Sequence, residues 1–200
     1  MKVFHVMERE MTGSMRQLGE IISTWGSSND RFHPFERWPR THFEGPDGPP
    51  TVGRIGTRAA AQFVMTQYDI GERIRISAKF MKPTGFDGYQ IAEGEEIGNG
   101  KLLLRAIIDM NTRGISGTLL WLFVMRPFHE AVIYDLFDKV ERDLGSSPQA
   151  HEWSLWVKFV RWTKRRNSSE YQRLHRGRLK EIEQAAARTA LMRSPSRPLR

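Results

Sequence analysis

Apolar and polar residues alternate through the middle of the chain. Every second residue from Ile74 to Phe80 is apolar, and residues 101–110 follow the same rule less strictly. A period of two is typical of strands that bury one face and expose the other. Turn residues divide the apolar runs at the segments DIGE, KPTG and GEEIGNG. The pattern predicts four strands, over residues 59–68, 73–80, 86–93 and 101–110.

Two shorter elements are expected before these strands. Residues 3–11 begin with the β-rich segment VFHV, which predicts another strand. Ser14 is suited to cap the helix that follows, MRQLGEIIST, in which the apolar residues fall on one face. Residues 25–50 contain five prolines and should form a loop, with one short strand in the segment WPRTHFE.

A single long helix is predicted over residues 115–144. Its second half is amphipathic, with one expected apolar side (Val132, Ile133, Leu136, Val140 and Leu144) and one expected polar side (Glu130, Asp135, Asp138, Glu141 and Arg142). The segment LLWLFVM, residues 119–125, is apolar all round, so we expect another surface to cover it. Pro127 lacks a backbone donor, which predicts a kink or a new helix start there.

This order of elements predicts an α+β fold. A curved antiparallel sheet would wrap around the long C-terminal helix, and the apolar faces of the sheet and the helix would enclose an apolar cavity. The residues predicted to line that cavity come from alternate strand positions and from the inner side of the helix. They are Phe63, Met65, Ile76, Ala78, Phe80, Phe86, Leu104, Ile108, Leu122, Met125 and His129.

Composition and charge indicate one domain with an appended segment. The chain has 200 residues, 39% of them hydrophobic, which is enough for one core. Its formal charge of +8 is uneven, because residues 148–200 hold 13 Lys and Arg against 4 Asp and Glu, whereas residues 1–147 hold 18 against 19. The break falls at a Gly/Ser/Pro cluster, GSSPQA. We predict a ligand-binding domain over residues 1–145, a basic Trp-rich helical extension over 146–193 and a disordered terminus over 194–200.

Cysteine is absent from the chain, which excludes disulfides, thiol nucleophiles and cysteine-ligated metals. Charges at residues 8–10 interrupt any apolar run of the kind found in signal peptides. The most apolar stretch, residues 115–125, is far shorter than the roughly 20 residues of a membrane span. We therefore expect a cytoplasmic protein.

The basic extension carries three tryptophans within ten residues, Trp153, Trp156 and Trp162. Tryptophan buries a large area when packed, so this cluster predicts a contact surface. Three partners are open: the apolar segment 119–125 of the same chain or of a second copy in a homodimer, an anionic membrane contacted through residues 153–166, and single-stranded nucleic acid. We rank them in that order and do not expect nucleic acid to be the partner.

Four segments carry a family resemblance. They are WPRTHFEGP (Trp38–Pro46), YDIGERIRI (Tyr68–Ile76), PTGFDG (Pro83–Gly88) and RPFHEAVIYDLFDKVE (Arg126–Glu141). Together with the order of elements, they make residues 1–144 resemble the START-like polyketide cyclase/dehydrase and lipid-transfer superfamily, also called SRPBCC. The resemblance implies a helix-grip fold with a deep hydrophobic cavity. It implies no single activity, because members include lipid and steroid carriers, hormone receptors and aromatic cyclases.

Few residues suggest chemistry. His129 shares a helix face with the predicted cavity lining, where a neutral imidazole can orient a ligand or move a proton. His42 and Glu44 stand two apart on one predicted strand and so share a face, in the order of a base and its orienting carboxylate. A core histidine and exposed strand polars are the commoner outcomes of these patterns. The histidine spacing supports no metal site, and Gly53 and Gly56 fit a turn rather than a nucleotide cofactor.

The sequence therefore predicts a protein that binds a hydrophobic small molecule or lipid-like ligand in an internal cavity, without metal or cofactor. The first alternative is an enzyme, a cyclase or dehydratase acting on an aromatic or polyketide substrate through His129 or through His42 and Glu44. Converging polar groups in the cavity would favour that enzyme, and an apolar lining would favour the carrier. The second alternative is a module recruited to a membrane or partner by the basic extension.

Overall fold

The computed structural model describes residues 1–59, 61–81, 85–148 and 151–162. The chain divides into two compact units, Met1–Glu152 and Trp153–Arg200. In the described part of the second unit, residues 155–162 form a helix. The predicted disordered terminus and most of the predicted basic extension lie outside the described residues, so the predicted domain limits stay predictions.

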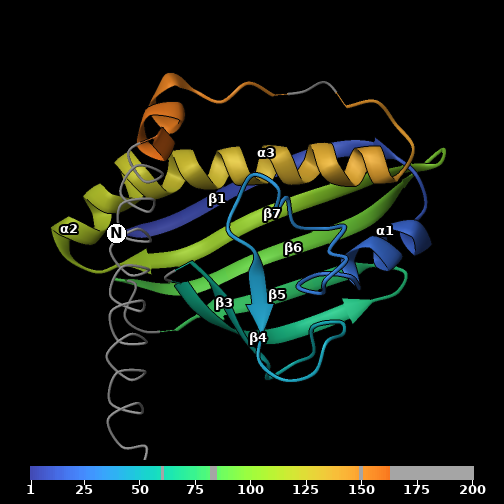
Figure 1. The fold of residues 1–200 in the computed structure, drawn as a ribbon, viewed down its shortest axis with the longest axis horizontal. Coiled ribbons are helices and arrows are strands. Elements are labelled where there is room, and N and C mark those ends of the chain that lie inside the picture. Colours follow the sequence, from blue (N-terminus) through green and yellow to red (C-terminus); the bar gives the residue numbers. More distant parts are fainter. Residues whose placement is uncertain (60, 82–84, 149–150, 163–200) are drawn as a thin grey trace, which may run out of the picture. The chain divides into compact units, whose positions relative to one another are not determined.

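A seven-stranded antiparallel sheet, counted over the described residues, forms the body of the first unit (Figure 1). In chain order the strands are β1 (Lys2–Thr12), β2 (Thr41–Phe43), β3 (Ile55–Arg58), β4 (Ala61–Ile70), β5 (Ile74–Phe80), β6 (Phe86–Gly98) and β7 (Lys101–Thr112). Across the sheet they follow the order β1-β7-β6-β5-β4-β3-β2. The first strand therefore pairs with the last, and each other strand pairs with its neighbour in the chain.

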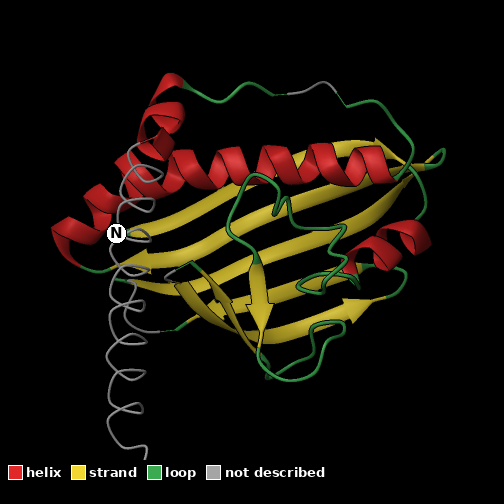
Figure 2. Cartoon of the chain, viewed as in Figure 1, coloured by secondary structure: helices red, strands yellow, loops and turns green. Residues whose placement is uncertain are grey.

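Helices pack on one face of this sheet (Figure 2). Helix α1 (Met15–Ile22) follows β1, while α2 (Gly114–Leu120), the π-helical turn η1 (Trp121–Met125) and α3 (Arg126–Asp143) follow β7 in succession. The Gln17 N–H donates to Ser14 Oγ at 3.3 Å and the Ser14 N–H donates to Gln17 Oε1 at 3.0 Å, which forms a capping box at the start of α1. The antiparallel sheet and the long C-terminal helix confirm the predicted α+β helix-grip architecture.

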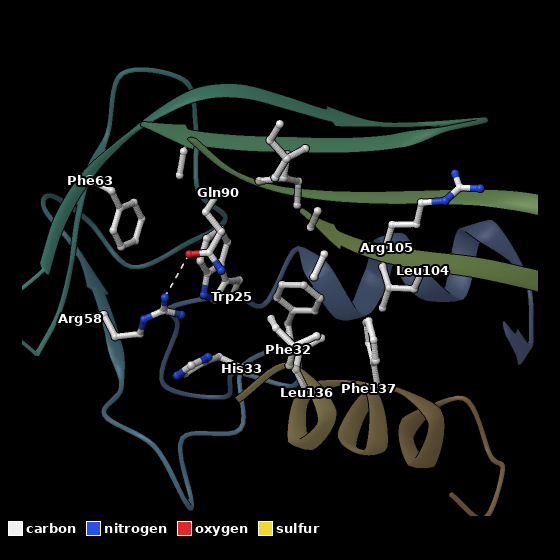
Figure 3. A pocket seen from close by; sticks show the side chains of 16 residues that line it. Trp25, Phe32, His33, Arg58, Phe63, Gln90, Leu104, Arg105, Leu136 and Phe137 are labelled. Carbon is white, nitrogen blue, oxygen red and sulfur yellow. Dashed lines mark hydrogen bonds between the residues drawn. The ribbon is translucent and has the colours of Figure 1, made fainter. Parts of the chain in front are cut away.

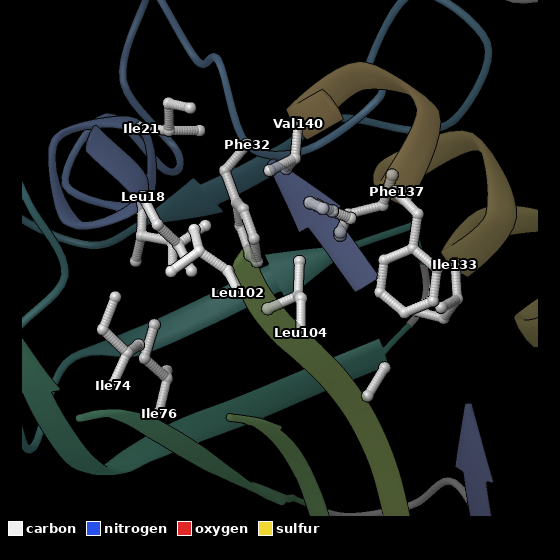
Figure 4. Close-up of a cluster of buried hydrophobic side chains, with 14 of the residues drawn as sticks. Leu18, Ile21, Phe32, Ile74, Ile76, Leu102, Leu104, Ile133, Phe137 and Val140 are labelled. Carbon is white, nitrogen blue, oxygen red and sulfur yellow. The ribbon is translucent and has the colours of Figure 1, made fainter. Parts of the chain in front are cut away.

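One apolar core joins the sheet to α1 and α3 (Figure 4). Leu18 from α1, Leu104 from β7 and Phe137 from α3 are each at most 1% exposed. Burying a side chain of this size stabilises the fold by roughly 1.5–3 kcal/mol relative to leaving it exposed. The core therefore ties α3 to the sheet along the half of the helix that the sequence predicted to be amphipathic.

Two strand assignments differ from the prediction. Gly56, expected in a turn, lies in β3, where a Cβ atom would come within 2.4 Å of the Phe63 ring, so glycine here makes room for an aromatic side chain. Strand β6 continues through residues 94–98, which were expected to be a turn. The turn needs only Asn99 and Gly100, whose φ angles are 53° and 68°, as in a two-residue hairpin turn.

The irregularity expected at Pro127 takes the form of a π-turn. The Arg126 N–H donates to the carbonyl of Trp121, five residues earlier, and Pro127 is the second residue of α3. A proline cannot donate to the carbonyl four residues before it and crowds that carbonyl. The wider turn accommodates both effects just ahead of Pro127.

Two carboxylates of α3 are buried, although the helix pattern placed them on the polar side. Asp135 is 3% exposed and accepts hydrogen bonds from Trp38 Nε1 at 2.7 Å and Arg37 Nη1 at 2.9 Å. Asp138 is 5% exposed and accepts from Arg9 Nη1 at 2.5 Å. The expectation of solvent was wrong because the proline-rich loop and β1 cover this side of the helix and supply the donors that water would.

Candidate ligand-binding site

A hollow lies between the sheet and α3 and is partly open to solvent (Figure 3). Its empty space is about 570 Å³ counted out to the solvent at the mouth, but only about 40 Å³ admits the centre of a water molecule. Ordinary ligand pockets measure roughly 300–1,000 Å³. The enclosed part is therefore smaller than the deep cavity expected from the sequence, because rings such as Phe32 and Phe137 occupy the space between the layers.

The lining of the hollow is mostly apolar, with twelve aliphatic or aromatic residues among sixteen. The four others are His33, Arg58, Gln90 and Arg105. Arg105 belongs to the outer face of the sheet, where its Nε pairs with Glu8 at 3.1 Å. Polar groups therefore reach the hollow mainly at one corner, near β3 and β6.

Arg58, the last residue of β3, is the charged group of that corner. Its side chain extends toward β6, and Nη2 donates to Gln90 Oε1 at 3.1 Å (dashed line in Figure 3). Burial lowers the pKa of Arg58 to about 10, so the guanidinium keeps its charge at neutral pH. Within the described residues, no carboxylate is paired with Arg58. A neutral amide is its only hydrogen-bond partner there.

His33 lies below Arg58 in the same view and is 1% exposed (Figure 3). Burial, assisted by the charge of Arg58, lowers the pKa of His33 to about 3, so the ring is neutral at physiological pH. Its Nε2 bonds to the carbonyl of Pro39 at 2.9 Å, which requires the proton on that nitrogen. Lys139 of α3 donates to the carbonyls of Asp30 at 2.9 Å and His33 at 3.0 Å and so fixes this loop segment.

Two more polar groups near this corner have no hydrogen-bond partner in the described part of the chain. They are Trp25 Nε1 and Thr41 Oγ1. Trp25 lines the hollow. Thr41 is fully buried and stands directly opposite Arg58 in the pairing of β2 with β3, so both side chains belong to the inner face of the sheet.

His129, a predicted lining residue and catalytic candidate, lies in a different group. Its ring centroid is 6.1 Å from that of His5 and 6.5 Å from that of Trp121. Both ring nitrogens are buried without a partner among the described residues, and burial, followed by the charges of Arg58 and His5, lowers the pKa of His129 to about 3. His5 Nε2 is 3.4 Å from Glu130 Oε1. The His129 imidazole is thus neutral and does not line the hollow.

Five of the predicted lining residues lie at or beside the hollow. Phe63, Ile76, Ala78 and Leu104 line it, and Met65 is buried in the adjoining core. They come from the inner positions of β4, β5 and β7. Strand alternation was sufficient to place these side chains on the helix side of the sheet.

The other predicted lining residues lie away from the hollow. Ile108 belongs to a second apolar cluster, against which Phe80 and Phe86 pack. Leu122 and Met125 are 40% and 38% exposed in η1. The π-turn winds more residues into each turn than an α-helix does, so an α-helical spacing assigned these two side chains to the wrong side.

The predicted pair His42 and Glu44 is exposed. In β2, Thr41 and Phe43 turn inward, so the alternate residue His42 turns outward. Glu44 follows the strand with the same outward alternation. This pair therefore stands on the opposite side of the sheet from the hollow.

Sequence reasoning missed the polar corner, above all Arg58 and Gln90. The glycine pattern predicts a turn where β3 lies, so the sequence gives no face for Arg58. The sequence does indicate Gln90. It alternates with Gly88 and Ala92 on the inward face of β6, where a polar residue is unusual.

Metal binding has no support in the described ranges. No group of three or more His, Cys, Asp or Glu side chains is placed there to hold an ion. The polar corner offers hydrogen-bond donors, which suit oxygen acceptors rather than cations. Separately, no helix within the described residues combines the length and apolar character needed to cross a bilayer.

No protein-family model and no curated protein matches the sequence. Solved structures do match: a hypothetical protein from Helicobacter pylori gives a TM-score of 0.55 at 9% identity, over 71% of this chain and 88% of that one. A Thermobifida fusca protein gives 0.55 at 12% identity, over 74% and 99%. Norcoclaurine synthase from Thalictrum flavum gives 0.49 at 13% identity, over 70% and 86%. The fold is a helix grip. At these identities the likeness concerns the fold alone.

Proposed function

We propose that this protein binds a small, largely apolar molecule in the hollow between the sheet and α3. The supporting observation is the make-up of that hollow, in which twelve apolar side chains surround a polar corner formed by Arg58 and Gln90. Small-molecule sites commonly combine an apolar lining with a few polar groups that orient the ligand. A carrier or a sensor needs no further chemistry.

Binding requires the lining to move, because about 40 Å³ holds only about three water molecules. The mobile part we infer is Trp25, which belongs to the loop after α1. Its ring stacks on Phe63 with a centroid distance of 6.1 Å and an interplanar angle of 9°. Loop residues move more readily than strand residues. Displacing Trp25 would widen the hollow, and the bound ligand would have to replace the contacts of this ring with Phe32, Phe43 and Phe63.

A carrier is favoured over the cyclase or dehydratase alternative because the candidate catalysts do not meet at the hollow. His42 and Glu44 are exposed on the other side of the sheet, and His129 packs with His5 instead. Arg58 remains protonated at neutral pH and cannot accept a proton from a substrate.

Titration with a neutral probe, 2-naphthamide, tests the proposal. We expect saturable one-to-one binding by calorimetry that Ala78→Leu weakens by about tenfold or more, because the added carbons fill the hollow. Gln62→Leu, an equally apolar change at an exposed position of β4, is the control and should leave binding intact. Binding that is absent, or unaffected by Ala78→Leu, would contradict the proposal.

A second candidate role concerns the outer surface of α2 and η1, called here the α2–η1 surface. Ile115, Leu119 and Leu122 are 81%, 50% and 40% exposed. Residues 113–129 include two arginines, Arg113 and Arg126, which pair with Asp87 at 3.2 Å and with Glu130 at 2.9 Å. Exposed apolar side chains flanked by basic ones are typical of helices that lie in an anionic membrane surface. We propose that the α2–η1 surface docks on such a membrane.

Vesicle cosedimentation tests this docking. The full chain should bind phosphatidylcholine vesicles that contain phosphatidylserine more tightly than pure phosphatidylcholine vesicles. The double change Ile115→Ser and Leu119→Ser should reduce that binding, whereas Val52→Ser, at an exposed apolar residue elsewhere, should not. Equal binding by both variants, or a homodimer that the double change dissociates, would contradict membrane docking.

A further inference from the structure

Arg58 is a half-buried positive charge for which the described residues provide no negative partner. Burial alone accounts for its lowered pKa, with no carboxylate acting on it. The buried acids of the adjoining loop and helix are engaged elsewhere: Asp30 accepts from the backbone N–H of His33 at 2.8 Å, and Asp135 accepts from Trp38. Buried charges are normally paired, because an unpaired one costs free energy of folding. An anionic partner from outside the chain would therefore compensate the charge of Arg58.

Three side chains at this corner, those of Arg58, Gln90 and Trp25, have donors left for further hydrogen bonds. Arg58 uses Nη2 on Gln90, which leaves Nη1 and Nε without partners among the described residues. Gln90 uses its Oε1 as the acceptor of that bond, so its amide NH₂ remains as a donor. Trp25 Nε1 is also a donor without a partner, and the three side chains converge in Figure 3. These three converging donors fit a group that accepts hydrogen bonds.

We propose that this corner holds the carboxylate of an amphipathic organic acid whose apolar body occupies the hollow. The proposal rests on the proposed function and names the class of ligand. A carboxylate accepts at both oxygens and matches the planar fork of a guanidinium, which an alcohol or ketone does not. A cation would be repelled by Arg58, and a neutral molecule would leave the charge of Arg58 uncompensated.

The field in the hollow supports an anion. His33 lines the hollow as a neutral ring, because burial and the charge of Arg58 lower its pKa. The charge of Arg58 also lowers the pKa of His129. The His33 ring carries no positive charge at neutral pH, and Lys139, which also acts on it, is paired with Glu36 at 2.8 Å. Arg58 therefore supplies the uncompensated charge of this corner. A single unit charge matches a monocarboxylate better than a phosphate dianion.

Two probes with one apolar body separate the contribution of the head group. We expect 2-naphthoate to bind the full chain at pH 7.5 at least about tenfold more tightly than neutral 2-naphthamide, as a charge-assisted hydrogen bond in a buried site would provide. Arg58→Met should remove this preference while 2-naphthamide binding persists. Arg58→Lys, which keeps the charge without the fork, should retain part of it. Arg75→Met changes an arginine of the outer face and should retain all of it.

The outcomes distinguish the two proposals. Equal affinity for both probes would overturn the anion site and leave the apolar site standing. Failure of both probes to bind would overturn both proposals. A preference that survives Arg58→Met, or that disappears in Arg75→Met, would show that Arg58 does not hold the carboxylate. If Arg58→Met does not fold by circular dichroism, Gln90→Leu is the second test and should lower the affinity for 2-naphthoate more than that for 2-naphthamide.

Discussion

Trp38 donates a 2.7 Å hydrogen bond from its indole nitrogen to the buried carboxylate of Asp135. The bond ties the proline-rich loop to α3. That loop also carries Trp25, Phe32 and His33, which form one wall of the hollow. The shape of the hollow therefore depends on a carboxylate that does not line it.

Asp135→Ala should destabilise the fold by about 3 kcal/mol, because it removes the acceptor of the buried Trp38 hydrogen bond and one interaction of Arg37. Urea unfolding followed by tryptophan fluorescence measures the change. The control is Asp143→Ala, which breaks an ion pair with Arg31 of 2.9 Å between partly exposed side chains and should cost less than about 1 kcal/mol. Similar small losses in both variants would show that the Trp38–Asp135 bond does not hold the loop.

Arg58→Met should stabilise the ligand-free protein by up to about 1 kcal/mol, since replacing a half-buried, uncompensated charge with an apolar side chain of similar length removes part of its desolvation cost. The measurement is the midpoint of urea unfolding at pH 7.5. Both side chains are compatible with a strand, so the substitution should not change the backbone of β3. A marked loss of stability would mean that Arg58 serves the fold rather than a ligand.

Stability should fall as the pH drops from 6.5 to 5.5. His33 and His129 have a pKa of about 3 in the folded chain, against 6.5 for a histidine side chain in water. The unfolded chain therefore binds protons in this range that the folded chain does not, so acid favours unfolding. Each histidine should cost about 1 kcal/mol over this interval, or roughly 2 kcal/mol together.

The histidine contributions can be separated by substitution. His129→Phe should reduce the loss of unfolding free energy between pH 6.5 and 5.5 by about 1 kcal/mol, because one of the buried imidazoles with a lowered pKa is gone. His42→Gln removes an exposed histidine and should leave the pH dependence unchanged. A pH dependence that His129→Phe does not alter would mean that this ring takes up a proton in the folded chain.

Strand and helix periodicity was enough to predict the fold. The alternation of Ile74, Ile76 and Ala78 placed them on the buried face of β5, and the structure confirms it. Such positions are decided by local spacing and by burial of one face, both of which are visible in the sequence. The order of strands and the position of the long helix then leave few ways to close a core.

The polar corner was not predictable by the same reasoning. Arg58 reads as an exposed strand-end residue until β3 is recognised, and its isolation depends on where distant acids such as Asp30 and Asp135 find their own partners. The buried state of Asp135 depends in turn on Trp38, far away in the chain. The burial of Asp135 and the lack of an acidic partner for Arg58 both depend on contacts between distant segments. The periodicity of a single helix or strand does not predict such contacts.

The most direct test of ligand binding in the hollow is a set of intermolecular nuclear Overhauser effects between 2-naphthoate and the methyl groups of the full chain. We predict contacts from the naphthalene ring to methyl groups of Ile76, Leu104 and Leu136, which line the hollow. Contacts confined to exposed methyl groups such as those of Ile115 and Leu119, or no contacts at saturating probe, would contradict the assignment of the hollow as the binding site.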